Sequence, residues 1–193
     1  LWDGTEEEGV QRGIGEALED AVACSVTAQQ YNSWGGWRYS PESNDADTSV
    51  SGAVLMGLLG ARNAGIEVPD ETVDKALAYF KQSTGPNGMV AYTGGLGGMG
   101  ESMNRSAMAT LVYAVGKQKD WQEYAATLRH VVVRLEHQES GYPNYFRYYM
   151  AQALFQGDLD SWEKWNRETI RLLKQSQRAD GSFQGNHGTS FST

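Results

Sequence analysis

Apolar side chains recur every three to four residues over long stretches of the chain, as they do along one face of an α-helix. In the first stretch, Val10, Ile14 and Leu18 share such a face. The amphipathic stretches cover residues 5–28, 70–80, 120–137 and 158–177. Asp70 follows Pro69 at the start of the second stretch and is predicted to be its N-cap, because Asp is among the best N-capping residues.

A second kind of helix is predicted between the amphipathic ones. These segments cover residues 47–64, 102–117 and 144–155, and the first two carry Gly, Ala and Ser on several faces. A glycine inside a helix costs about 1 kcal/mol relative to alanine. We therefore expect close approach of neighbouring helices to compensate, and about seven helices in all, in an all-α fold.

A unit of glycine followed by a bulky residue recurs along the chain, with a helix of each kind on either side. The copies are Gly35-Gly36-Trp37, Gly88-Met89-Val90, Gly141-Tyr142 and Gly181-Ser182-Phe183. Helical pairs that repeat about every 50 residues stack side by side into a superhelix or a closed ring. The pattern therefore predicts an arc or a partial barrel of repeats.

The composition of the chain limits the kinds of partner and environment that it suits. The chain has 193 residues and a net charge of −8, which argues against nucleic acid because phosphates require basic patches. No stretch approaches the length of a membrane span. Cys24 is the only cysteine, which excludes an internal disulfide framework. Because the chain opens on Leu1 and its last residues read as another helix start, we expect residues 1–193 to be one domain of a longer parent chain.

The glycine joints carry a family resemblance. Lys75-Ala76-Leu77-Ala78-Tyr79-Phe80 fits the first half of a repeat signature, which runs basic, small, any residue, aromatic, aliphatic and then Gln, Gly and an aromatic. Thr84 stands where the Gln is expected, and Gly88 and Val90 follow at the right distance. Partial copies are Val26, Gln30, Gly35 and Trp37, and Leu173, Gln177, Gly181 and Phe183. The chain thus resembles the squalene–hopene cyclases and the prenyltransferase-repeat proteins. This resemblance implies an α/α toroid in which the Gln bonds backbone and the aromatic stacks on the next repeat.

The candidate catalytic residues are Asp45 and Asp47, in Asn44-Asp45-Ala46-Asp47-Thr48-Ser49. The cyclases that the chain resembles hold an Asp-x-Asp-Asp-Thr run here, and one of its acids protonates an alkene. Paired carboxylates suit that task because like charges raise one pKa. Ala46 stands where the central acid would be. The alternative interpretation makes Asp47 a helix N-cap and leaves Asp45 solvated.

Candidate ligand-binding residues lie at the joints and on the helices that follow them. They are Trp37, Tyr92, Glu101, Arg105 and Tyr145. Aromatic rings suit an apolar ligand, although core packing explains them equally well. Residues 95–100 match G-x-G-x-x-G, but no second strand follows, so we interpret them as a loop between repeats.

Three hypotheses of function result. The first is a binding domain that holds an apolar small molecule or a protein partner on a concave face, without a cofactor. The second is a cyclase-like isomerase that uses Asp45 and Asp47. The third, a zinc lipid transferase, lacks an Asp two residues before Cys24, and no metal ligands are therefore predicted.

Overall fold

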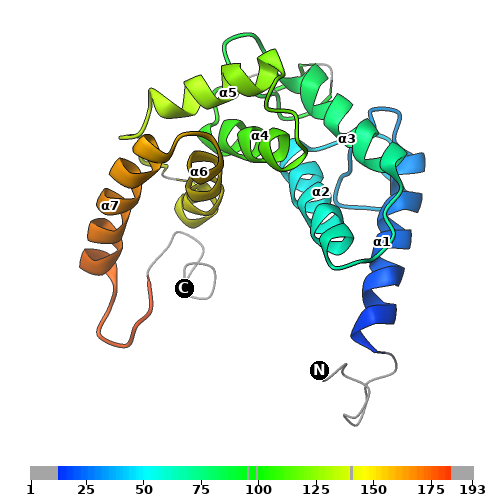
Figure 1. The fold of residues 1–193 in the computed structure, drawn as a ribbon, viewed down its shortest axis with the longest axis horizontal. Coiled ribbons are helices and arrows are strands. Elements are labelled where there is room, and N and C mark those ends of the chain that lie inside the picture. Colours follow the sequence, from blue (N-terminus) through cyan, green and yellow to red (C-terminus); the bar gives the residue numbers. More distant parts are fainter. Residues whose placement is uncertain (1–12, 95, 99, 140, 184–193) are drawn as a thin grey trace. The chain divides into compact units, whose positions relative to one another are not determined.

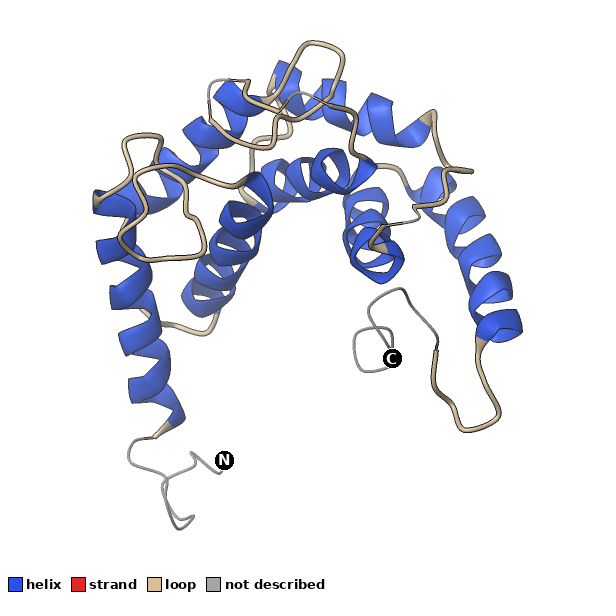
Figure 2. Cartoon of the chain, turned by 180° about the vertical axis from the view of Figure 1, so that it is seen from behind, coloured by secondary structure: helices blue, strands red, loops and turns tan. Residues whose placement is uncertain are grey.

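The computed structural model describes residues 13–94, 96–98, 100–139 and 141–183. Over these residues the chain forms α-helices joined by loops, without a β-strand (Figures 1 and 2). The helices are α1 (Ile14–Gln30), α2 (Thr48–Asn63), α3 (Asp70–Ser83), α4 (Met103–Val115), α5 (Gln122–Val132), α6 (Pro143–Gly157) and α7 (Leu159–Ser176). The predicted all-α class is confirmed.

The chain divides into two compact units. Unit 1 comprises Leu1–Ser83 and Ala91–Met99, with helices α1 to α3. Unit 2 comprises Thr84–Val90 and Gly100–Thr193, with helices α4 to α7. Each unit pairs a helix rich in small residues with an amphipathic one, α2 with α3 and α4 with α5. That the whole chain acts as one domain stays a prediction.

Two predicted helix ends are wrong. Asp70 is the first residue of α3 rather than its N-cap, because the Pro69 carbonyl accepts the first helical hydrogen bonds, from the N–H groups of Thr72 and Val73. α5 ends at Val132, several residues before the predicted end. The predicted start of the first helix lies outside the described residues.

The prediction of tight packing around small residues holds for α4 and fails for part of α2. α4 buries all of its residues except Arg105 and Val115. In α2, Gly57 and Gly60 are exposed, and no atom of the described residues lies within 4 Å of a Cβ built on either. These two glycines therefore weaken α2 without a packing gain inside unit 1.

The glycine joint of unit 1 requires glycine for two reasons. Gly35 has φ +80°, and a Cβ built there would lie 2.8 Å from the Lys75 carbonyl oxygen of α3. Gln29 seals the joint, because its Nε2 donates to the carbonyls of Gly35 (2.7 Å) and Thr72 (3.0 Å). The repeat signature placed Gln30 at the position that bonds backbone at the joint. Gln30 is exposed, so that assignment is wrong, and its neighbour Gln29 makes these hydrogen bonds instead.

Unit 2 repeats the joint. Gly88 has φ +79°, and a Cβ there would lie 2.2 Å from the Ala126 carbonyl oxygen of α5. Ser106 Oγ of α4 donates to the Gly88 carbonyl at 2.9 Å. Gly88 is thus held between α4 and α5.

The last two glycine units differ from each other. Gly181 has φ +84°, and Gln177 Nε2 donates to its carbonyl at 2.9 Å, as the repeat signature implies. Gly141 lacks a positive φ. The third copy, whose spacing is one residue short, therefore does not adopt the same turn.

Candidate functional site

Asp47 is the N-cap of α2. Its Oδ1 accepts hydrogen bonds from the N–H groups of Ser49 (2.7 Å) and Val50 (3.1 Å). Its own N–H donates to the Trp37 carbonyl at 2.8 Å, and the residue has no exposed surface. The capping interpretation of Asp47 is therefore confirmed, because Oδ1 satisfies two N–H groups that α2 itself leaves free.

Asp45 lies in a different environment. Its Oδ2 pairs with Arg38 Nη1 at 2.9 Å, and its side chain is half exposed. The Asp45 carbonyl accepts a short hydrogen bond from Asn32 Nδ2. One carboxylate of the predicted acid pair is thus a buried cap, and the other is a surface ion-pair partner.

Tyr92 is the predicted ligand residue that lies beside this cap. Hydrogen bonding to Asp47, followed by burial, raises the pKa of its phenol to about 12. The Arg38 guanidinium lies 5.9 Å from the centroid of the Tyr92 ring. The Tyr92 carbonyl accepts from the Thr48 N–H at 3.0 Å. Through its contacts with Asp47 and Thr48, Tyr92 stabilises the packing of its loop against the start of α2.

Trp37 and Tyr145 are used in packing. Trp37 is 4% exposed, and its Nε1 donates to the Ser25 carbonyl of α1 at 2.8 Å. Tyr145 packs edge-on against Tyr149, with ring centroids 4.7 Å apart, and its hydroxyl lies 3.9 Å from Met108 Sδ. Both residues follow the packing interpretation of the aromatic positions.

Arg105 bonds to backbone next to the glycine-rich loop. Its Nε donates to the Val90 carbonyl at 2.8 Å, and its Nη2 donates to the Gly100 carbonyl. Within the loop, the Tyr92 N–H donates to the Gly97 carbonyl at 3.0 Å. The described part of residues 95–100 is therefore a turn, and the helix after it leads into another helix, as the loop interpretation predicts.

Glu101 is the predicted ligand residue that lines a pocket. We define the Glu101 pocket as the cavity of about 740 Å³ in unit 2, between the start of α4 and the end of α5. Its apolar lining is Met103, Val132, Val133 and Leu135, and its polar lining is Glu101, Ser102, Arg134, Glu136, His137 and Glu139. The pocket arises because α5 ends at Val132 and the chain turns away there.

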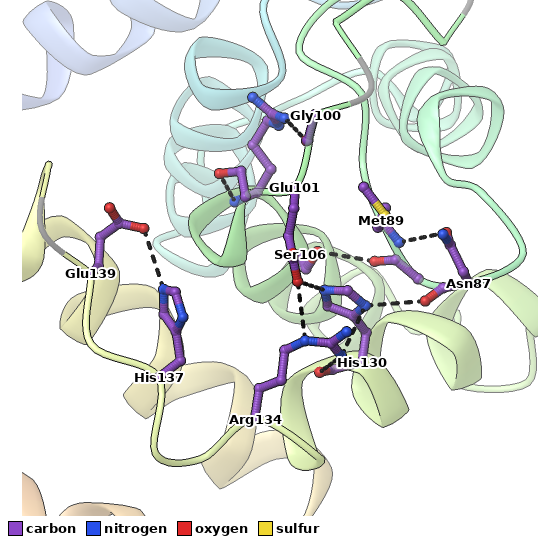
Figure 3. Close-up of polar contacts among 12 residues, drawn as sticks. Asn87, Met89, Gly100, Glu101, Ser106, His130, Arg134, His137 and Glu139 are labelled. Atoms are coloured by element: carbon purple, nitrogen blue, oxygen red, sulfur yellow. Dashed lines mark hydrogen bonds and ion pairs between the residues drawn. The ribbon is translucent and has the colours of Figure 1, made fainter.

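The His130 ring lies next to the Glu101 carboxylate (Figure 3). Its side chain is 4% exposed, and its Nδ1 lies 3.1 Å from the Asn87 carbonyl oxygen. Nε2 lies 3.8 Å from Glu101 Oε1, to which Arg134 Nε donates at 3.1 Å. Burial and the Arg134 charge hold the pKa of His130 below its ordinary value, against the opposing effects of Asn87 and Glu101.

His137 follows His130 by seven residues, a spacing that would place both on one face of a continuous helix, but α5 ends at Val132 and His137 lies outside it. Its Nε2 lies 3.6 Å from Glu139 Oε2, and its ring packs edge-on against Phe146. Figure 3 shows His137 directed at Glu139, and His130 and Arg134 directed at Glu101. The two histidines therefore belong to separate clusters.

Sequence reasoning missed Arg38 and Arg134 as partners of the acidic residues. The signal for Arg134 was present, since it follows His130 by one helical turn. No such signal marks Arg38, because its pairing with Asp45 depends on the path of a loop. Among the residues with described positions, no three His, Cys, Asp or Glu side chains gather where they could hold a metal ion.

Comparison with known proteins finds no protein-family model and no curated protein that matches the sequence. Within the described part of the chain, no helix combines the length and apolar character needed to cross a membrane.

Proposed function

We propose that the chain is a binding domain that holds a small apolar ligand in the Glu101 pocket. The observation that carries this proposal is the pocket itself. Its volume of about 740 Å³ falls in the range of about 300–1,000 Å³ that is typical of ligand sites. Four apolar side chains, from the start of α4, the end of α5 and the turn after it, offer a surface to a ligand beside six polar residues. A cavity of this kind favours a small molecule over a protein partner.

The α/α toroid and the prenyltransferase-repeat family are part of the same proposal. Gly35 and Gly88 support them, because each is a positive-φ glycine pressed against a backbone carbonyl of the following amphipathic helix. Gln29 and Gln177 support them as well, since each donates to the carbonyl of a joint glycine. Repeats with equivalent joints are what a toroid requires.

The geometry of Asp47 gives no support to the cyclase alternative. A carboxylic acid that protonates an alkene must present its proton to the substrate, whereas Asp47 is fully buried and its Oδ1 accepts two backbone hydrogen bonds. Asp45 is held by Arg38 at the surface. A cyclase activity that Asp47→Asn abolishes in the full-length protein would contradict our proposal.

Binding of 1-hexanol, followed by NMR of the Val and Leu methyl groups, tests the proposal. We expect the methyl resonances of Val132 and Leu135 to shift saturably. Leu135→Ala should weaken binding about fivefold, since about 1 kcal/mol of apolar contact is lost when a partly exposed Leu is truncated. Ile170→Ala, a similar truncation on α7 at a residue that is 44% exposed, is the matched control and should leave binding unchanged. No shift at the pocket methyls would refute the proposal.

A further inference from the structure

Two hydrogen-bond acceptors face each other directly beneath the lining of the Glu101 pocket: Glu101 belongs to the lining, and His130, which does not, contacts Glu101 from the protein interior. The Asn87 carbonyl can only accept, so the 3.1 Å contact with His130 Nδ1 requires the proton to be on Nδ1. Neutral His130 then presents a bare lone pair at Nε2, and Glu101 Oε1 lies 3.8 Å from this atom. No described residue donates a hydrogen bond to Nε2, which is buried.

This arrangement is unfavourable unless a donor joins the two acceptors. Desolvating an imidazole nitrogen without a partner costs about 1–3 kcal/mol. Burial and Arg134 disfavour protonation of His130, so the ring itself does not readily supply the missing hydrogen. Arg134 does not donate a hydrogen to Nε2 either. Its Nε binds Glu101, and its Nη1 donates to the His130 carbonyl at 3.1 Å. The Arg134 Nη1 also lies 3.4 Å from the other ring nitrogen of His130, Nδ1.

The charge around the pocket selects the kind of donor. Three carboxylates line it, those of Glu101, Glu136 and Glu139, against the single guanidinium of Arg134. Even if the one histidine of the lining is counted as a cation, the three carboxylates outnumber the positive groups, so the lining carries a net negative charge. A cation is attracted to this lining and an anion is repelled.

We propose that the Glu101 pocket binds a ligand in which a primary ammonium group is attached to an apolar body; this inference rests on the binding function proposed above. The ammonium donates one hydrogen to His130 Nε2 and another to Glu101 Oε1. One nitrogen can lie within hydrogen-bond distance of both, about 2.7–3.2 Å, because the acceptors are only 3.8 Å apart. A hydroxyl group has one hydrogen and can serve only one of them.

The rest of the pocket accommodates the remaining parts of such a ligand. Val132 and Leu135 lie next to Glu101 in the lining and offer the apolar contact. The Glu101 side chain is 56% exposed, so it can move to admit the ammonium to the buried Nε2 and then return to accept its second hydrogen bond. Glu101 then remains the counter-charge of the bound group.

Three probes with one apolar tail and different head groups test this inference on the complete chain. They are hexylammonium, 1-hexanol and hexanoate, and their affinities are measured from the pocket methyl shifts while the His130 Nε2 resonance is followed by ¹⁵N NMR. We expect hexylammonium to bind about tenfold more tightly than 1-hexanol, since a hydrogen bond to a charged group contributes about 1.5–3 kcal/mol. It alone should shift Nε2, and hexanoate should bind most weakly.

Glu101→Gln and Glu136→Gln form the matched pair of variants, because each removes one carboxylate from the pocket lining and only Glu101 faces His130. Glu101→Gln should remove most of the preference for hexylammonium and leave 1-hexanol binding unchanged, while Glu136→Gln should reduce that preference by about twofold at most. Equal binding of 1-hexanol and hexylammonium, or equal effects of the two variants, would overturn the ammonium inference and leave the binding function intact. Tighter binding of hexanoate would overturn it as well. If no probe shifts the pocket methyls, the proposed binding function itself fails.

Discussion

Replacing Gly88 by alanine tests the joint that positions His130 and the Glu101 pocket. Gly88 has φ +79°, a backbone conformation that costs an L-residue about 1–2 kcal/mol. A Cβ at this position would also lie 2.2 Å from the Ala126 carbonyl oxygen and 2.7 Å from His130 Cβ. Both contacts fall well inside van der Waals distance, so α5 must move away from the joint.

The two effects add. Overpacking of this kind costs about 1–3 kcal/mol, so Gly88→Ala should lower the free energy of unfolding by about 2–5 kcal/mol in total. Because α5 carries His130, the same change should weaken the Nδ1 contact with Asn87 and shift the His130 ring resonances. Urea unfolding followed by far-UV circular dichroism measures the first effect, and NMR of the histidine ring measures the second.

Gly57→Ala is the matched control. Gly57 lies inside α2, is exposed, and has no described atom within 4 Å of a built Cβ. Alanine there should raise the free energy of unfolding by about 1 kcal/mol. The reasoning about the joints is refuted if Gly88→Ala is as well tolerated as Gly57→Ala, or if the urea midpoints of both variants move in the same direction.

Three further substitutions examine single contacts. Asp47→Asn should preserve the cap and change the free energy of unfolding by less than about 0.5 kcal/mol. It should also lower the Tyr92 pKa from about 12 toward 10, which ¹³C NMR of the tyrosine rings measures. An unchanged Tyr92 pKa would contradict the contact with Asp47. Because the Tyr92 pKa is raised by folding, the stability that this contact provides is present below about pH 10 and is lost as the pH rises toward 12. Gln29→Ala should lower the free energy of unfolding, measured in urea, by about 2–3 kcal/mol, because the carbonyls of Gly35 and Thr72 lose their donor. Gln30→Ala, at an exposed residue, should lower it by less than about 0.5 kcal/mol. Similar losses in the two variants would mean that Gln29 does not stabilise the glycine joint. Because folding lowers the His130 pKa, the His130 ring of the unfolded chain is protonated first as the pH falls below about 6.5. The free energy of unfolding should therefore decrease between pH 7 and 5.5, and it should decrease less in His130→Gln. An equal decrease in this variant would exclude His130 as the source of the pH dependence.

The helices and their order follow from the sequence because they depend on local spacing. The three-to-four periodicity predicted α1, α3, α5 and α7, the small-residue segments predicted α2 and α4, and the alternation of the two kinds of helix predicted α6. Boundaries were less predictable. Asp70 resembles an N-cap in sequence, yet the helix begins one residue earlier than that assignment requires, because the Pro69 carbonyl accepts from the N–H groups of Thr72 and Val73.

The chemistry of the candidate sites was only partly predictable. Asp47 was expected either as an acid or as a cap, and both readings fit the same six residues of sequence. The choice depended on where the N–H groups of Ser49 and Val50 point, which is set once α2 forms. Gln29 and Gln30 are neighbours with the same side chain, and the direction of each at the end of α1 decides which one is buried.

The sequence by itself determined the all-α class, the two kinds of helix and the places of the glycine joints. Each of these is a local property: a period of apolar residues, a count of small ones, or a turn that needs positive φ at Gly35 or Gly88. Only the tertiary structure decided that His130 faces Glu101 across the edge of a pocket. That contact joins residues distant in sequence, and it exists because Gly88 lets α5 pack tightly against the joint and because α5 stops at Val132.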